Sequence, residues 1–345
     1  MIKIALIEVG HFHDECLYSQ VQYLNTSDFE LTLFCNVKLK PRIDNFQDVK
    51  EIVYLDFSTK LNKYKSMFQI WRRITKYNFS KIILNSAESN VYKLLKFPFP
   101  KNIEITGIIH NAQNLKNKGK QIAISKRIHK YFALNDFVKN NILNEKLTSN
   151  KVEAFYPIFF EALESKLNKP LTEVWITVPG AMDFNKRDYE ALVSLKIPKH
   201  IKIIFLGSCN SSEAKRFLKE MKNAPIHSNL VFFDSFIDNE LFFDYIKNSD
   251  YILPLIHPKN DSFKNFLKYK ISGSYNLAFG FKIPLLMEQS FSGIPDFEEN
   301  AIFYDSTKFE ILFEKIKTCT KKMYCNSKWD FEYQRQKYTK FILNE

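Results

Sequence analysis

Several titratable side chains stand where apolar runs of the sequence end. His11, His13 and Asp14 directly follow the first apolar run, and His110 closes a later one. An imidazole or carboxylate can orient a substrate hydroxyl or take its proton when it lies within hydrogen-bonding distance. If both runs are strands of one parallel sheet, these side chains lie at its carboxyl edge, where ligands bind. They are our candidate catalytic residues, and an ordinary polar loop is the alternative.

A second group of residues has the chemistry of an anion site. Ser272, Gly273 and Ser274 stand where a helix is expected to begin. Backbone N–H groups at a helix start favour an anion, as does the helix dipole, and glycine permits a close approach of the backbone. Lys270 adds a full positive charge just before this turn. The alternative is a simple helix cap, with serine as the N-cap residue.

Two further cations occupy a loop in the second half of the chain. Lys186 and Arg187 follow the apolar run at 174–180. A loop at the carboxyl end of a parallel strand is placed to contact a ligand. Arginine is the better suited of the two to a bidentate phosphate contact. An exposed helix start without a ligand is the alternative.

Metal sites and disulfides are not indicated. The seven histidines are dispersed, and the five cysteines contain no Cys-x-x-Cys pair. No pair of carboxylates with Asp-x-Asp spacing stands at a predicted strand end. We therefore expect chemistry without a metal or cofactor, and a reducing, cytoplasmic environment.

The elements that must position these residues alternate along the whole chain. Apolar runs are expected to form strands at 2–9, 30–36, 51–57, 81–86, 103–110, 121–125, 130–135, 152–160, 174–180, 201–208, 229–237, 251–258, 283–288 and 301–305. Amphipathic helices are expected between many of them, including one at 187–196. Such alternation indicates mostly parallel sheets covered by helices.

The domain boundary is expected at the polar stretch 161–173, after which the alternation restarts. The sequence therefore predicts an α/β protein with two doubly wound, Rossmann-like domains facing a cleft. The N-terminal domain spans 1–165 and the C-terminal domain spans 166–325. A last helix at 326–345 is expected to pack back on the N-terminal domain.

The net charge of +12 favours anionic partners. No zinc-finger, RNA-recognition or basic-zipper pattern is present, so nucleic acid is not an expected partner. No run of about 18 apolar residues is present either, which predicts a soluble or peripheral protein. The helix at 63–77 interleaves cations with aromatic residues and could rest on anionic lipid; the alternative is ordinary packing on the first sheet.

In the second half, several motifs occur in a familiar order: Glu240-Leu241, then Asp250, then Pro254, and a small-residue turn from Gly280 to Pro284. In the first half, the segment ITGIIHNA delivers His110. This order resembles that of GT-B glycosyltransferases of the retaining family-four type. The chain resembles a divergent member, because Ala181 replaces the usual arginine and the usual paired glutamates are absent.

The resemblance implies transfer of a sugar from a nucleotide-diphosphate sugar to a saccharide or lipid-linked acceptor in bacterial surface polysaccharide or lipopolysaccharide synthesis. It places the donor diphosphate at the anion site described above. Five strand-end residues would then line the nucleotide or sugar: Gly180, Gly207, Phe236, His257 and Glu288. The alternatives are a nucleotide-sugar epimerase of the same fold and a non-catalytic sugar-nucleotide-binding protein.

Overall fold

The structure is a computed structural model that describes residues 1–117, 119–161, 164–193, 195–222, 224, 226–233, 237–318 and 322–345. Backbone contacts divide the chain into two compact units. Unit 1 comprises Met1–Phe160, Tyr269–Ile271 and Asp330–Glu345, and unit 2 comprises Glu161–Lys268 and Ser272–Trp329.

Unit 1 is built on a seven-stranded sheet with the order β3-β2-β1-β4-β5-β6-β7. Its strands are β1 (Ile2–Glu8), β2 (Phe29–Asn36), β3 (Glu51–Leu55), β4 (Lys81–Leu84), β5 (Glu104–Ile109), β6 (Lys130–Ala133) and β7 (Lys151–Ala154). Every pairing between neighbours is parallel. The chain reverses its direction of travel across the sheet between β1 and β4. This is the topological switch point, where the loops on either side diverge and leave room for a ligand.

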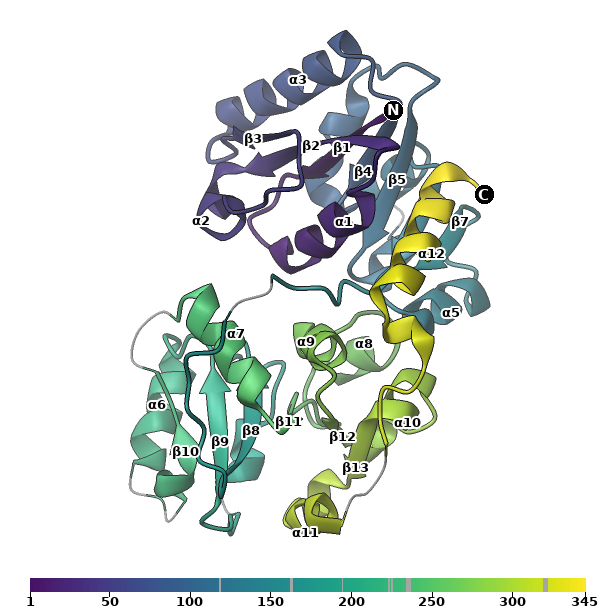
Figure 1. The fold of residues 1–345 in the computed structure, drawn as a ribbon. Helices are drawn as coiled ribbons and strands as arrows, with labels where there is room; N and C mark the ends of the chain where they lie inside the picture. The colour runs from purple at the N-terminus through teal and green to yellow at the C-terminus, as the bar shows by residue number, and fades with distance from the viewer. Residues whose placement is uncertain are drawn as a thin grey trace. The chain divides into compact units, whose positions relative to one another are not determined.

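Helices cover both faces of this sheet (Figure 1). They are α1 (Leu17–Leu24), α2 (Lys40–Ile43), α3 (Lys60–Lys76), α4 (Lys120–Ser125), α5 (Asp136–Asn144) and α12 (Phe331–Leu343). Alternate residues of β1, Ile4 and Leu6, pack with Leu17 of α1 and Tyr338 of α12 in one core. Helix α3 lies on the other side of the strands from α1.

A buried lysine ties the last helix to unit 1. The ammonium group of Lys130 donates to the backbone carbonyl groups of Phe341 and Ile342 and pairs with Glu104 at 2.8 Å. A cation at the last carbonyl groups of a helix satisfies groups that have no partner within the helix. The chain terminus therefore belongs to the core of unit 1.

Unit 2 has a six-stranded parallel sheet with the order β10-β9-β8-β11-β12-β13. Its strands are β8 (Val174–Pro179), β9 (Ile201–Leu206), β10 (Leu230–Val231), β11 (Tyr251–Ile252), β12 (Leu285–Glu288) and β13 (Ala301–Tyr304). Its helices are α6 (Ser212–Met221), α7 (Asn239–Asn248), α8 (Phe263–Lys268), α9 (Gly273–Phe281), α10 (Pro295–Asn300) and α11 (Ile311–Thr318). The switch point lies between β8 and β11. The predicted class, α/β with two Rossmann-like units, is confirmed.

Two predicted elements are wrong. Residues 121–125 form part of α4 rather than a strand, because an alternation over five residues is too short to separate the two periods. Of the helix expected at 187–196, the described residues form a 3-10 turn at Tyr189–Leu192, and Asp188 caps it by accepting from the Ala191 N–H group. The strand at 152–160 is also shorter, since β7 ends at Ala154.

Candidate functional site

Three neighbouring strands of unit 1, β1, β4 and β5, bring a buried polar group to their carboxyl ends. Glu8 ends β1 and is only 1% exposed. Its carboxylate accepts hydrogen bonds from Gly10 N at 2.6 Å, Asn85 Nδ2 at 2.7 Å and Ser86 Oγ at 2.6 Å. Burial raises the pKa of Glu8, although these hydrogen bonds act to lower it. The carboxylate thus anchors the loops that follow β1 and β4.

His13 and His110 lie face to face beside this anchor. Their ring centroids are 3.7 Å apart and the rings are stacked. His13 has the left-handed backbone conformation, with φ 67°, and its carbonyl oxygen accepts from Asn85 Nδ2 at 2.9 Å. His110 Nε2 lies 2.6 Å from the carbonyl oxygen of Asn85. Because a carbonyl only accepts, Nε2 carries the proton of neutral His110 and Nδ1 carries the lone pair.

The two imidazoles differ in basicity. Burial, together with the neighbouring positive charge of His13, lowers the pKa of His110 to about 3. Burial also acts to lower the pKa of His13, but the hydrogen bond and charge of Glu15, with the charges of Glu8 and Glu88, outweigh it and raise that pKa above 6.5. A proton acceptor works best when its pKa is close to the working pH. His13 is therefore the better base, and His110 is suited to orienting a substrate.

Glu15 completes a pair of the kind that activates a general base. Its Oε1 lies 3.3 Å from His13 Nδ1. A carboxylate at one ring nitrogen selects the tautomer with its proton there, which leaves the other nitrogen free to accept a proton. Both side chains are about 40% exposed, so a substrate can reach them.

The other two predicted residues of this loop have a different environment. Asp14 accepts from Arg42 Nη1 at 2.7 Å, and Arg42 Nη2 also donates to the carbonyl oxygen of His11 at 2.9 Å. The side chain of His11 is exposed and leans on Phe12. Arg42 therefore holds the loop in place through Asp14, while His13 and His110 form the pair at the strand ends.

The sequence prediction missed the anchor beneath that pair: Glu8, Asn85 and Ser86. One signal was present, because Glu8 is a charged residue that directly follows the apolar run Ile4–Ile7 at the end of the strand. Asn85 and Ser86 follow β4 directly, but nothing local to them indicates that they meet Glu8.

In unit 2, the side chain of Arg187 spans two elements at the carboxyl edge. Its Nη1 donates to the carbonyl oxygen of Gly180 at 3.2 Å, and its Nη2 lies 3.4 Å from Ser274 Oγ at the start of α9. Gly180 has φ +98°, and a Cβ atom there would lie 3.1 Å from Arg187 Nη2. Glycine therefore supplies both the left-handed turn and the room for the guanidinium group.

The start of α9 combines a cap with open space. Ser272 is the N-cap residue, and its Oγ accepts from Ser274 N at 3.3 Å, as expected for a capping serine. A Cβ atom at Gly273 would meet no atom within 4 Å. The positive end of a nine-residue helix, a glycine beside open space and a guanidinium group thus adjoin one another, which is a suitable arrangement for a phosphate.

Gly207, at the end of β9, allows the backbone of Gly180 to pass close to it. A Cβ atom there would lie 2.3 Å from both the carbonyl carbon and the carbonyl oxygen of Gly180. Because real side chains never approach backbone atoms so closely, only glycine fits. Gly207 thus sets the position of the turn that carries Gly180.

Two other predicted phosphate ligands have contacts within their own units. Lys186 is half exposed and pairs with Asp183 at 2.7 Å. Lys270 belongs to unit 1, where it forms an isolated antiparallel bridge with Asn111, the residue after His110. The sequence placed Lys270 in the same domain as the Ser272–Ser274 turn. Arg187 contacts that turn directly, since its Nη2 lies 3.4 Å from Ser274 Oγ. A role of Lys186 or Lys270 at a phosphate stays a prediction.

Three predicted residues of the second half remain: His257, Glu288 and Phe236. His257 is buried, its Nδ1 lies 2.8 Å from Asp188 Oδ2 and its Nε2 lies 2.8 Å from Tyr304 Oη. Since both ring nitrogens are engaged within the protein, we assign His257 to the framework rather than to ligand contacts. Glu288 ends β12, and its Oε2 accepts from Ser290 N at 2.8 Å. Phe236 lies outside the described residues.

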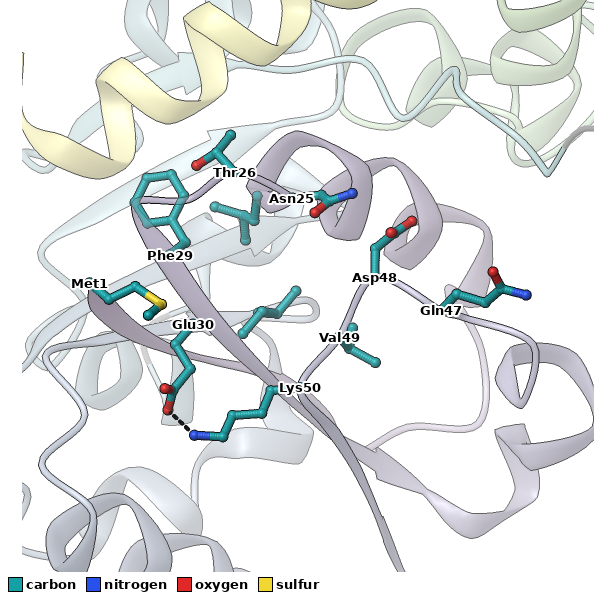
Figure 2. A pocket seen from close by; sticks show the side chains of 11 residues that line it. Met1, Asn25, Thr26, Phe29, Glu30, Gln47, Asp48, Val49 and Lys50 are labelled. Atoms are coloured by element: carbon teal, nitrogen blue, oxygen red, sulfur yellow. Dashed lines mark ion pairs between the residues drawn. The ribbon is translucent and has the colours of Figure 1, made fainter.

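The surface has one hollow near the carboxyl ends of strands and another near the amino ends of strands. One of about 260 Å³ adjoins the loop after β8 and is lined by Arg187, Asp188 and Lys259 among others. Another, of about 420 Å³, opens in unit 1 beside Met1 and Phe29, and Figure 2 shows the Glu30–Lys50 ion pair that closes one side of it. Those residues stand at the amino ends of β1 and β2, opposite the edge where parallel sheets bind ligands. We therefore do not place the site there.

Within the described ranges, no group of three or more His, Cys, Asp or Glu side chains is arranged to hold a metal ion. Every helix in those ranges is too short or too polar to span a lipid bilayer.

No protein-family profile matches this sequence, and no curated protein matches it. Solved structures do match over the full length. S. aureus MnaA in complex with UDP is 12% identical, with a TM-score of 0.63, over 100% of this chain and 97% of that chain. UDP-GlcNAc 2-epimerase from Neisseria meningitidis bound to UDP-GlcNAc is 10% identical, with a TM-score of 0.61, over 100% of both chains.

A glycosyltransferase from Rickettsia africae is 14% identical, with a TM-score of 0.59, over 99% of this chain and 93% of that chain. These likenesses establish the fold, which is that of GT-B-like enzymes with two Rossmann-like domains. At such low identity they establish nothing finer. The resemblance to the retaining family-four type stays a prediction.

Proposed function

We propose that this protein is an enzyme that acts on a nucleotide-diphosphate sugar. The observation that carries the proposal is the guanidinium group of Arg187, held between Gly180 and Ser274 at the open start of α9. Breaking the bond between an anomeric carbon and a diphosphate builds negative charge on the departing group. Preorganised donors and a cation at that group stabilise the transition state.

The structural neighbours support a uracil nucleotide as the first ligand to test. One was solved with UDP and another with UDP-GlcNAc. Glu288, at the end of β12, is suited to accept a hydrogen bond from a ribose or sugar hydroxyl. Since it already holds Ser290 N through one carboxylate oxygen, its orientation is set before a ligand arrives.

Two reactions fit this site. Epimerisation is favoured by the neighbours, several of which are UDP-GlcNAc 2-epimerases. Glycosyl transfer to a saccharide or lipid-linked acceptor is favoured by the order of motifs in the sequence. Both need a group that moves a proton, and the Glu15-supported imidazole of His13 can do so in either case.

A thermal-shift screen tests the shared part of the proposal. UDP and UDP-sugars are expected to raise the melting temperature, because a ligand that binds only the folded state stabilises it by about 2.7 kcal/mol at 100 times its Kd. Uridine, which lacks the diphosphate, is the control and should stabilise far less. Equal effects of UDP and uridine would remove the diphosphate site from the proposal.

Product analysis then separates the reactions. With the nucleotide sugar alone, an epimerase converts it to its epimer, whereas a transferase shows only slow hydrolysis until an acceptor is added. Nuclear magnetic resonance of the sugar distinguishes these products directly. Tight binding with no turnover under either condition would indicate a non-catalytic sugar-nucleotide-binding protein.

The transferase reading includes contact with a membrane that carries a lipid-linked acceptor, and α3 supplies the surface for it. One face of α3 buries Met67, Ile70 and Ile74, as in an ordinary packed helix. The adjacent face exposes Leu61, Tyr64 and Phe68, which are 62%, 59% and 42% exposed. We call these three residues, with Trp71 and Phe97, the aromatic patch; the rings of Tyr64, Phe68 and Trp71 all pack on Phe97.

Helix α3, which carries most of the aromatic patch, is strongly positive. Helix α3 contains six lysines and arginines and no acidic residue. Lys93, Lys96 and Lys101 add exposed cations near Phe97 in the sequence. Apolar rings among cations suit an anionic bilayer, where each nearby cation contributes about 1 kcal/mol.

We expect the protein to sediment with phosphatidylcholine vesicles only when phosphatidylglycerol is included. The double substitution Leu61→Ser and Phe68→Ser should abolish this binding, while Ile122→Ser, at an isoleucine of α4 that is 44% exposed, should not. Equal binding with and without phosphatidylglycerol would refute the membrane contact. Unchanged binding of the doubly substituted protein would refute it as well.

A further inference from the structure

A continuous chain of buried hydrogen bonds connects the C-terminal helix with the catalytic pair of unit 1. Tyr338 Oη in α12 donates to Gln20 Oε1 at 3.0 Å, and Gln20 Nε2 donates to Asn85 Oδ1 at 2.6 Å. Asn85 Nδ2 in turn donates to Glu8 Oε2 and to the carbonyl oxygen of His13. The side chains of Tyr338, Gln20 and Asn85 are completely buried.

The donor and the acceptor of each hydrogen bond in this series are fixed by the carbonyl groups it contacts. Gln20 Nε2 also donates to the carbonyl oxygen of Cys16 at 2.9 Å, and that oxygen can only accept. The two hydrogens of the Gln20 amide are then used, as are the two of the Asn85 amide. Gln20 Oε1 is therefore an acceptor that needs a donor, and Tyr338 supplies it.

Asn85 connects this chain of hydrogen bonds to both histidines. Its side chain holds the backbone of His13 in the left-handed conformation, and its own carbonyl oxygen binds His110 Nε2. One residue thus sets the position of both stacked imidazoles. A displacement of the Asn85 amide would move them relative to each other.

We propose that Tyr338 is a positioning residue for the His13–His110 pair, acting through Gln20 and Asn85. This inference rests on the proposed function, in which the pair serves the turnover of a nucleotide sugar. Helix α12 would then support the histidine pair, although it lies far from both histidines in the sequence. The helix completes the support of the site as well as covering the sheet.

Tyr338→Phe isolates the hydroxyl group. The Tyr338 ring stacks on Phe132 with centroids 4.6 Å apart, and phenylalanine keeps that contact. The substitution leaves Gln20 Oε1 buried without its donor, which frees the glutamine and then the asparagine to shift. We expect kcat to fall about 10-fold, with KM for the nucleotide sugar changed less than twofold.

Tyr23→Phe is the matched control. Tyr23 is also completely buried, its ring lies 5.4 Å from that of Tyr338, and its hydroxyl donates to the carbonyl oxygen of Tyr156 at 2.7 Å. It therefore loses a hydrogen bond of the same kind in the same core, but one that does not lead to Asn85. Both variants should lose comparable unfolding free energy in urea, and only Tyr338→Phe should lose kcat.

A second measurement does not depend on activity. The Hε1 resonances of His13 and His110 report the surroundings of the two rings, and spectra of histidine variants assign them. Both resonances should shift in Tyr338→Phe and remain in place in Tyr23→Phe. Identical spectra for Tyr338→Phe and the wild type, or equal changes in both variants, would overturn the proposal. If no nucleotide sugar is turned over by the wild type, the proposed function fails while the spectra still decide the role of Tyr338.

Discussion

Replacing His13 with asparagine is expected to slow nucleotide-sugar turnover about 100- to 10,000-fold, the usual contribution of a general base. Asparagine is the appropriate replacement because His13 has φ 67°, a left-handed conformation that asparagine adopts more readily than most residues. The Glu8 anchor does not depend on the imidazole, so the loop should keep its shape. Nucleotide affinity should therefore stay close to that of the wild type.

His11→Asn is the control for this substitution. His11 lies two residues earlier in the same loop; its side chain is exposed and contacts the Phe12 ring, and its backbone carbonyl accepts from Arg42. Its replacement should leave turnover nearly unchanged. A loss of less than about tenfold in His13→Asn would show that His13 orients the substrate rather than taking its proton.

The pH dependence gives a further test of the same assignment. His13 must be neutral to accept a proton, so the rate should fall as pH drops below its pKa, which Glu15 helps to hold above 6.5. Glu15→Gln removes that charge and lowers the pKa of His13, so the acid limb should move to lower pH. The limb should not follow His110, whose pKa of about 3 keeps it neutral throughout this range.

Arg187→Ala is expected to weaken binding of UDP and UDP-sugars by about 1.5–3 kcal/mol, or roughly 10- to 150-fold in Kd. It should also lower kcat about 100- to 1,000-fold, since charge at the departing diphosphate is greatest in the transition state. Isothermal titration and steady-state rates measure the two effects. Arg187→Lys should recover only part of each, because lysine keeps the charge but loses the planar pair of donors.

Lys186→Ala separates a specific contact from general electrostatics. It removes the same charge from the neighbouring position, where the ammonium group pairs with Asp183 and is half exposed. Nucleotide affinity should change little. Equal losses in Lys186→Ala and Arg187→Ala would mean that only the net charge of the loop matters.

The predicted anion site of unit 2 could be read partly from the sequence, because its residues form local patterns. A serine before a helix, a glycine within the turn and an arginine after a strand are each readable from neighbouring residues. Gly180 and Gly207 were recognised as strand ends, but their closeness was not. Nothing in either segment shows that a Cβ atom at Gly207 would lie 2.3 Å from the Gly180 backbone, because β8 and β9 meet only in the sheet.

The prediction for the loop after β1 and for His110 shows the opposite balance. His13 and His110 were both predicted, yet their stacking depends on β1 and β5 lying on either side of β4, an order that only long-range packing sets. Burial then lowers the pKa of His110, whereas the carboxylates of Glu15, Glu8 and Glu88 outweigh burial at His13 and raise its pKa.

By itself, the sequence determined the α/β class, most of the strands and the strand-end positions of the candidate residues, because hydrophobic period and helix capping are properties of short segments. Only the tertiary structure decided that Glu8 and Asn85 support the histidines, that Lys270 groups with Asn111, and that Tyr338 reaches Gln20 from 318 residues away. These contacts join segments with no common local pattern, and the packing of the complete units brings them together.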